Sequence, residues 1–267
     1  MSHSSNFLEM AGLVTDAAVV AALLMGLWLA MQRTKLAWPT RVRTFCVIAA
    51  ILLLWYGAIS LIGAMGLLRA TPDVKFPALP LAVFPPIAIG LWLIFRSKIM
   101  AEIIDATPLT WLVSIQAYRV VGVTFLVLMA AGLLPPQFAL PAGSGDIVVG
   151  LLALPVAWAV GTGTRPAIAA AYIWNMLGLL DFIVALSTGF LSSPGRFQML
   201  ALDHPNLLAS AYPLVMIPAW LVPLSSILHG VCLWKLRRGD RPAARRAAAP
   251  EPWAGRPQEI IAPTGST

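Results

Sequence analysis

The sequence predicts an all-α membrane protein: a bundle of seven transmembrane helices with its N-terminus outside the cell and its C-terminus in the cytoplasm. Of the 267 residues, 59% are hydrophobic and 11% are charged. A soluble domain has about 45–50% apolar and about 25% charged residues. The apolar residues form seven long runs, and most basic residues lie between alternate runs. These observations exclude a soluble protein and make the lipid bilayer the first predicted partner.

A helix needs about 20 apolar residues to cross the hydrocarbon core of a bilayer. By this measure of length, seven runs are predicted to be spans. The fifth run is the shortest of them. The predicted spans are residues 10–31, 44–68, 78–95, 109–134, 146–161, 166–190 and 212–234.

The orientation of the bundle follows from its basic residues, because cytoplasmic loops of membrane proteins carry an excess of Lys and Arg. The loops after spans one, three and five, together with the segment after span seven, hold 14 of the 18 basic residues. The opposite loops hold three, which are Arg69, Lys75 and Arg196. The net charge of +7 is therefore explained by topology, and no nucleic-acid partner is predicted.

Spans one, three and seven end in a similar way. Their ends read "GLWLAMQR" (26–33), "GLWLIFRSK" (90–98) and "CLWKLRR" (232–238), each with a Trp shortly before a basic residue. Trp prefers the membrane interface, and Lys or Arg extends to the headgroups. Helices that end alike are expected to cross the membrane in the same direction.

The start of the fifth span is ambiguous. The preceding stretch "LPPQFALPAGSGD" (134–146) is rich in turn-forming residues. One interpretation is a tight outer turn with Asp146 in the first turn of the helix, where an acid suits the helix dipole. The other is a short re-entrant loop that covers a cavity above Arg119.

Arg119 lies inside the fourth apolar run, where a charge costs about 2.5–3.5 kcal/mol on insertion scales. Such a residue normally faces the bundle interior and pairs with an acid. Span directions and depths make Asp181 the first candidate partner, Asp146 the second and Asp16 the third.

Helical spacing adds polar neighbours to this arginine. Gln116 is three residues from Arg119 and lies on the same face. In span six, Trp174 and Asp181 are seven residues apart, and Asn175 flanks their face. The predicted substrate-binding set is Arg119, Gln116, Asp181, Asn175, Trp174 and Asp146.

The sequence carries no pattern for a cofactor or a catalytic centre. The histidines are His3, His204 and His229, and no pair of them suits haem ligation between helices. The sequence contains no HExxH, GxSxG or phosphate-binding glycine loop. No metal site, cofactor or catalytic residue is predicted, and an enzyme is not favoured because no nucleophile–base pair is evident.

The stretches "FALPAGSGDIVVG" (138–150) and "WNMLGLLD" (174–181) carry a resemblance. They look like segments of uncharacterised bacterial polytopic inner-membrane proteins. The resemblance covers spans four to six and implies a multi-pass protein of the bacterial cytoplasmic membrane. It brings no function with it.

Two units and two functions are predicted. Residues 1–238 form the membrane domain, and residues 239–267, rich in Ala, Pro and Arg, form a disordered basic cytoplasmic tail. The leading hypothesis is a transporter or binding protein for a small polar or anionic solute, held at Arg119. The alternative is a membrane scaffold or assembly factor in which Arg119 and Asp181 form a structural clamp. Helix breaks that permit gating are expected at prolines 80, 85, 86, 213 and 218.

Overall fold

The computed structural model describes residues 2–74 and 77–239, with side chains from residue 12 onward, and its regular elements are all helical. Seven helical segments are long and apolar enough to cross a membrane, so the chain is a multi-pass membrane protein. The predicted tail lies outside the described residues, apart from Gly239. The elements are α1 (Ser2–Gln32), α2 (Trp38–Ala64), α3 (Leu79–Arg96), α4 (Lys98–Ala106), α5 (Leu109–Ser114), η1 (Ile115–Gly122), α6 (Val123–Ala130), α7 (Pro136–Gly161), α8 (Arg165–Ser192), η2 (Ile217–Leu221) and α9 (Val222–Arg237).

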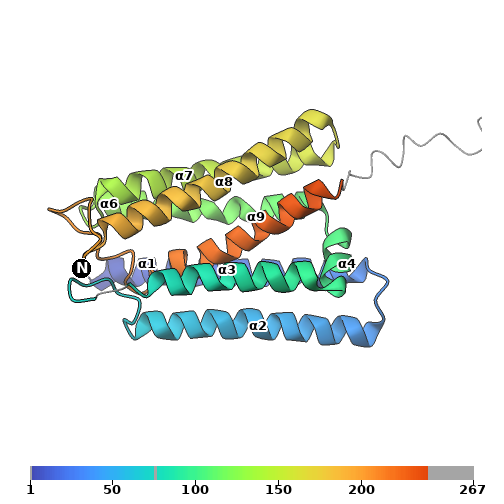
Figure 1. Ribbon diagram of the computed structural model, residues 1–267, viewed down its shortest axis with the longest axis horizontal. Coiled ribbons are helices and arrows are strands. Elements are labelled where there is room, and N and C mark those ends of the chain that lie inside the picture. Colours follow the sequence, from blue (N-terminus) through green and yellow to red (C-terminus); the bar gives the residue numbers. More distant parts are fainter. Residues whose placement is uncertain (1, 75–76, 240–267) are drawn as a thin grey trace, which may run out of the picture.

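The spans alternate in direction, so α1, α3 and α9 end at the same end of the bundle (Figure 1). Contacts between their ends agree with this arrangement. The rings of Phe95 and Trp234 stack with centroids 5.6 Å apart, and the Lys35 amide donates to Glu102 of α4 at 2.7 Å. The three similar Trp–basic ends therefore lie together, as the sequence predicts. The N-terminus and the end of α9 lie at opposite ends (Figure 1).

Helix α4 was not expected from hydropathy. The Ser97 hydroxyl caps its N-terminus by accepting a hydrogen bond from the Met100 amide at 3.2 Å. Its apolar face buries Ile103 and Ile104. At its last turn, the buried Lys235 ammonium of α9 donates to the Ile104 and Asp105 carbonyls at 2.7 and 2.9 Å. A cation is favourable there because the last carbonyls of a helix lack partners within it.

The fifth span begins ten residues earlier than the sequence predicts. Helix α7 is continuous from Pro136 to Gly161, so neither the tight turn nor the re-entrant loop is present. Asp146 consequently lies in the interior of the helix rather than in its first turn. Pro136 fits at the helix start because the first amides have no intrahelical acceptor. Pro141 is tolerated inside, as prolines often are in membrane helices.

The predicted proline breaks are wrong for α3. That helix is regular through Pro85 and Pro86, and Pro80 lies in its first turn. In the seventh span, Pro218 lies in η2, a π-helical turn that precedes α9, while Pro213 precedes η2. The fourth span also departs from an α-helix, since η1 is a 3₁₀-helix between α5 and α6.

Candidate functional site

Arg119 lies in η1, at the centre of the fourth span. A 3₁₀-helix has three residues per turn, so side chains three apart lie directly above one another. Gln116, Arg119 and Gly122 form such a row, and all three are buried. Helix α7 packs along η1, while α8 and α9 complete the surroundings of the row. The non-α geometry thus directs Gln116 and Arg119 into the bundle.

The Arg119 guanidinium contacts protein groups through each of its nitrogens. Nε donates to Asp146 Oδ1 of α7 at 2.8 Å, and Nη2 donates to Asp181 Oδ2 of α8 at 2.5 Å. Nη1 lies 3.4 Å from the Gly178 carbonyl oxygen and 3.1 Å from His229 Nε2 of α9. The guanidinium also lies 3.9 Å above the ring of Phe182. The side chain is 2% exposed.

The structure therefore gives Arg119 both of its first two predicted partners at once. The third candidate, Asp16 of α1, is buried but belongs to a different polar group, beside Tyr56 of α2. Arg119 consequently links η1 to α7 and α8 through two carboxylates, and its contact with the His229 ring also links η1 to α9. Below, the Arg119 cluster means Arg119, Asp146, Asp181 and His229.

Asn175 of α8 holds the His229 ring in place. Its Nδ2 donates to the Ala171 carbonyl at 2.8 Å and lies 3.3 Å from Cys232 Sγ. Its Oδ1 therefore faces His229 Nδ1, at 2.8 Å. An amide oxygen only accepts, so Nδ1 carries the proton and Nε2 presents its lone pair to Arg119. The imidazole in this geometry is neutral and accepts from the guanidinium.

Gln116 and Trp174 have supporting positions, because each hydrogen-bonds to a neighbouring helix. Gln116 Nε2 donates to the Ser225 carbonyl at 3.2 Å, and the Ser225 hydroxyl donates to Gln116 Oε1. Trp174 Nε1 donates to the Val149 carbonyl at 3.0 Å, and its ring lies 5.1 Å from the His229 ring. Both therefore fix neighbouring helices around the cluster.

Small residues allow these helices to approach. Asp146, Gly150, Ala153 and Ala157 follow one another along one face of α7, and all four are buried, so this face of mostly small residues points into the bundle. At Gly178 of α8, an added Cβ would lie 2.5 Å from the His229 ring and 3.0 Å from Arg119 Nη1. Only a glycine lets the α8 backbone come this close to the cluster.

The sequence interpretation missed His229. The signal that could have identified it is the spacing of Ser225, His229 and Cys232, four and three residues apart on one face of α9. All three are buried and contact the polar residues of η1 and α8.

The cluster holds two carboxyl groups, one guanidinium and a neutral imidazole, so its carboxyl groups outnumber its cations by one. The adjoining cavity measures about 10 Å³ and is lined by Tyr118, Asp146, Phe182 and neighbouring apolar residues. That is about the space of one water molecule. Among the described side chains, no group of three or more His, Cys, Asp or Glu is placed to hold a metal ion.

A family model described as Domain of unknown function (DUF8737) matches residues 76–237, more than half of the chain. The chain belongs to this family. No curated protein and no solved structure matches the chain.

The DUF8737 region begins just before α3 and ends at the last residue of α9. All four residues of the Arg119 cluster lie within it, whereas α1 and α2 lie outside. Of the three acids considered as partners, Asp146 and Asp181 belong to the DUF8737 region and Asp16 does not.

Proposed function

We propose that this DUF8737 protein is a structural membrane protein, a scaffold or assembly factor, in which the Arg119 cluster clamps η1, α7, α8 and α9 together. The observation that carries the proposal is the 2% exposure of Arg119 with a protein contact at each of its nitrogens. A binding site for a polar solute needs donors turned toward a space for that solute. Here the donors are occupied, and the adjoining cavity has room for about one water molecule.

The physical role of such a clamp is to specify one arrangement of helices. Lipid tails are as apolar as leucine, so membrane helices gain little from the hydrophobic effect when they associate. Close packing and polar contacts decide instead which helices meet. An arginine that must reach two acids on two helices and a histidine on a third is satisfied in one arrangement only.

We further propose that the protein lies in a bacterial cytoplasmic membrane, with the end of α9 in the cytoplasm and the N-terminus outside. The support is the 14 of 18 basic residues on the proposed inner side. The resemblance of residues 138–150 and 174–181 to bacterial inner-membrane proteins supports the choice of membrane.

The clamp is tested by looking for ligands that stabilise the folded state. The purified protein is heated with each of a panel of small anions, including chloride, acetate, phosphate and free amino acids. A ligand that binds only the folded protein raises its melting temperature, by linkage. The clamp predicts no rise that depends on Arg119. A rise in the wild type that is absent in Arg119→Met contradicts it.

A second function, transport of a small anionic solute, is favoured by two observations. The cluster has an excess carboxyl group, and two non-α segments, η1 and η2, lie in the spans that supply its core. Such segments often mark functional sites in membrane helices. An anion would replace one carboxylate at Arg119, and that carboxylate would take up a proton.

This alternative has a separate readout. The protein is reconstituted into vesicles that contain a pH-sensitive dye, and the same anions are added outside. Transport predicts acidification that accompanies anion entry and disappears in Asp181→Asn. The clamp predicts the same slow drift as in vesicles without protein.

A further inference from the structure

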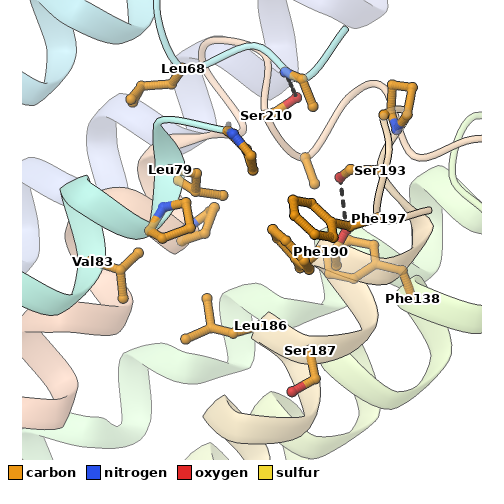
Figure 2. Close-up of a pocket in the computed structure, with 18 of the residues that line it drawn as sticks. Leu68, Leu79, Val83, Phe138, Leu186, Ser187, Phe190, Ser193, Phe197 and Ser210 are labelled. Atoms are coloured by element: carbon orange, nitrogen blue, oxygen red, sulfur yellow. Dashed lines mark hydrogen bonds between the residues drawn. The ribbon is translucent and has the colours of Figure 1, made fainter. Parts of the chain in front are cut away.

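A second feature of the molecule lies at the opposite end from α4, away from the Arg119 cluster. It is a cavity of about 360 Å³ between the first turns of α3 and the last turns of α8 (Figure 2). Leu79 and Val83 line it from α3, and Leu186 and Phe190 line it from α8. The volume falls within the range of about 300–1,000 Å³ that is typical of ligand pockets.

The lining of this cavity is largely apolar. Two of its hydroxyl groups are already bonded to the backbone: Ser193 donates to the Gly189 carbonyl at 2.7 Å, and Ser210 donates to the Leu207 carbonyl at 3.3 Å. Ser210 also accepts from the Ala70 amide at 3.0 Å. Water in such a cavity finds few partners, and cavities lined by apolar groups accept apolar molecules instead.

The position of the cavity indicates where an apolar occupant would come from. Helices α3 and α8 are both candidate membrane spans, so the medium beside them is lipid. Phe84 of α3 lines the cavity and is 58% exposed, which places part of the wall in contact with that lipid. The cavity therefore lies beside the hydrocarbon region, with an exposed aromatic residue in its wall.

The loop after α8 marks the depth of the cavity in the membrane. This loop contributes Arg196 and Phe197 to the lining, and the Arg196 guanidinium lies 5.0 Å above the Phe197 ring. Both residues are exposed. An arginine beside an aromatic ring at the end of a span is typical of the headgroup region. A molecule with an apolar chain in the cavity would have its polar end at this level.

We propose that this cavity holds one acyl chain of a phospholipid from the bilayer, with the lipid phosphate at the level of Arg196. The apolar wall selects the chain, and the positive charge of the guanidinium attracts a phosphate. This binding goes beyond the clamp, which concerns a different part of the bundle. It makes the chain a lipid-binding membrane protein.

The experiment uses the full chain in vesicles of phosphatidylethanolamine and phosphatidylglycerol, with a small share of phosphatidylglycerol that carries a photoreactive diazirine in its acyl chain. After irradiation and digestion, mass spectrometry locates the cross-links. The proposal predicts cross-links concentrated on residues 79–84 and 185–197. Leu186→Trp fills the cavity and abolishes them. Ile183→Trp, on the lipid-exposed side of the same helix, leaves them unchanged.

Ordinary contact with surrounding lipid gives a different pattern. Cross-links spread equally over exposed residues of α2, such as Leu54, and unaffected by Leu186→Trp would overturn the proposal. Melting temperatures of both variants establish that they fold, and Ala185→Leu is a milder filling variant if Leu186→Trp does not.

A second measurement identifies the molecule. The protein is purified in detergent, and its bound lipids are extracted and weighed by mass spectrometry. The proposal predicts that phospholipid co-purifies with the wild type and Ile183→Trp, and is lost from Leu186→Trp. A free fatty acid or another apolar molecule in its place would show that the cavity does not select a phospholipid. Retention of phospholipid by all three proteins would show that it binds elsewhere.

Discussion

Spans four to seven and spans one to three are packed very differently. In the apolar stretch of the seventh span 67% of the residues are buried inside the protein, against 6% in the second span. Spans four, five and six lie at 33%, 39% and 33%, whereas spans one and three reach 22% and 11%. In Figure 1, α2 lies along the edge of the bundle, and α9 passes between the other helices.

The difference coincides with the distribution of polar groups. Arg119, Asp146, Asp181 and His229 all belong to spans four to seven, as do the glycines that let these helices approach. Helix α2 instead turns large apolar side chains outward, Leu54 among them at 73% exposure. A polar cluster requires surrounding protein, because lipid cannot satisfy it. Spans four to seven, which are the more densely packed, are therefore also the spans that must surround the charged groups of the Arg119 cluster.

Substitution of Arg119 is expected to have the largest effect on this contrast. Arg119→Met leaves two buried carboxyl groups without their cation, and breaking a buried pair from one side costs about 3–5 kcal/mol. Thermal unfolding in detergent measures this loss. The matched control is Arg238→Met, which removes an ion pair with Asp105 in which both side chains are 48% exposed. That change should cost about 0–1 kcal/mol.

The next largest difference in stability is expected between the same leucine truncation made in spans four to seven and in spans one to three. Leu221 is 4% exposed and Leu54 is 73% exposed. Leu221→Ala is expected near the lower end of about 2–5 kcal/mol, because detergent also solvates this leucine after unfolding. Leu54→Ala exchanges one lipid-facing side chain for another and should change the melting temperature little. Equal losses would show that α2 is packed against protein in solution.

Adding one methyl group to a glycine probes the same contrast more gently. Gly178→Ala pushes a Cβ against His229 and should cost about 1–3 kcal/mol, as overpacking does. At Gly57 of α2 an added Cβ meets nothing within 4 Å. Gly57→Ala should instead stabilise the helix by up to about 1 kcal/mol. Opposite signs in thermal unfolding are the expected result, and a loss at both sites would contradict the contrast.

The orientation can be tested without affecting stability. A reporter that is active only in the cytoplasm should work when fused after Arg238. It should fail when fused after Asp203, in the loop between α8 and η2. The reverse pattern would refute the orientation derived from the basic residues.

Much of this architecture follows from composition, because long apolar runs have few alternatives in a membrane. The sequence correctly predicts seven spans and the alternation that brings the ends of α1, α3 and α9 together. The start of α7 was predicted too late, because its turn-forming residues were interpreted as a loop. Pro136 is in fact favourable at a helix start, and Pro141 is tolerated within the helix. The geometry of η1 and η2 depends on packing between helices, which hydropathy does not report.

The charge partners of Arg119 were predictable because spans contain few acids. Asp146 and Asp181 were two of three candidates, and both contact the arginine. His229 was missed, and Gln116 bonds to Ser225 instead of joining the guanidinium. Both errors have one cause: the rotation of α9 about its axis decides which of its residues face η1. Tertiary packing sets that rotation.

Arg119 is held by both acids at once, and a thermodynamic cycle tests this arrangement most directly. Thermal unfolding in detergent is measured for Arg119→Met, Asp181→Asn, Asp146→Asn and the two double variants that include Arg119→Met. Residues in one network are expected to couple by about 0.5–3 kcal/mol. The predicted result is that each double variant loses less stability than the sum of its single changes, because no charge is then left alone. Effects that add within error for both pairs would contradict this arrangement and show that the arginine does not hold these helices together.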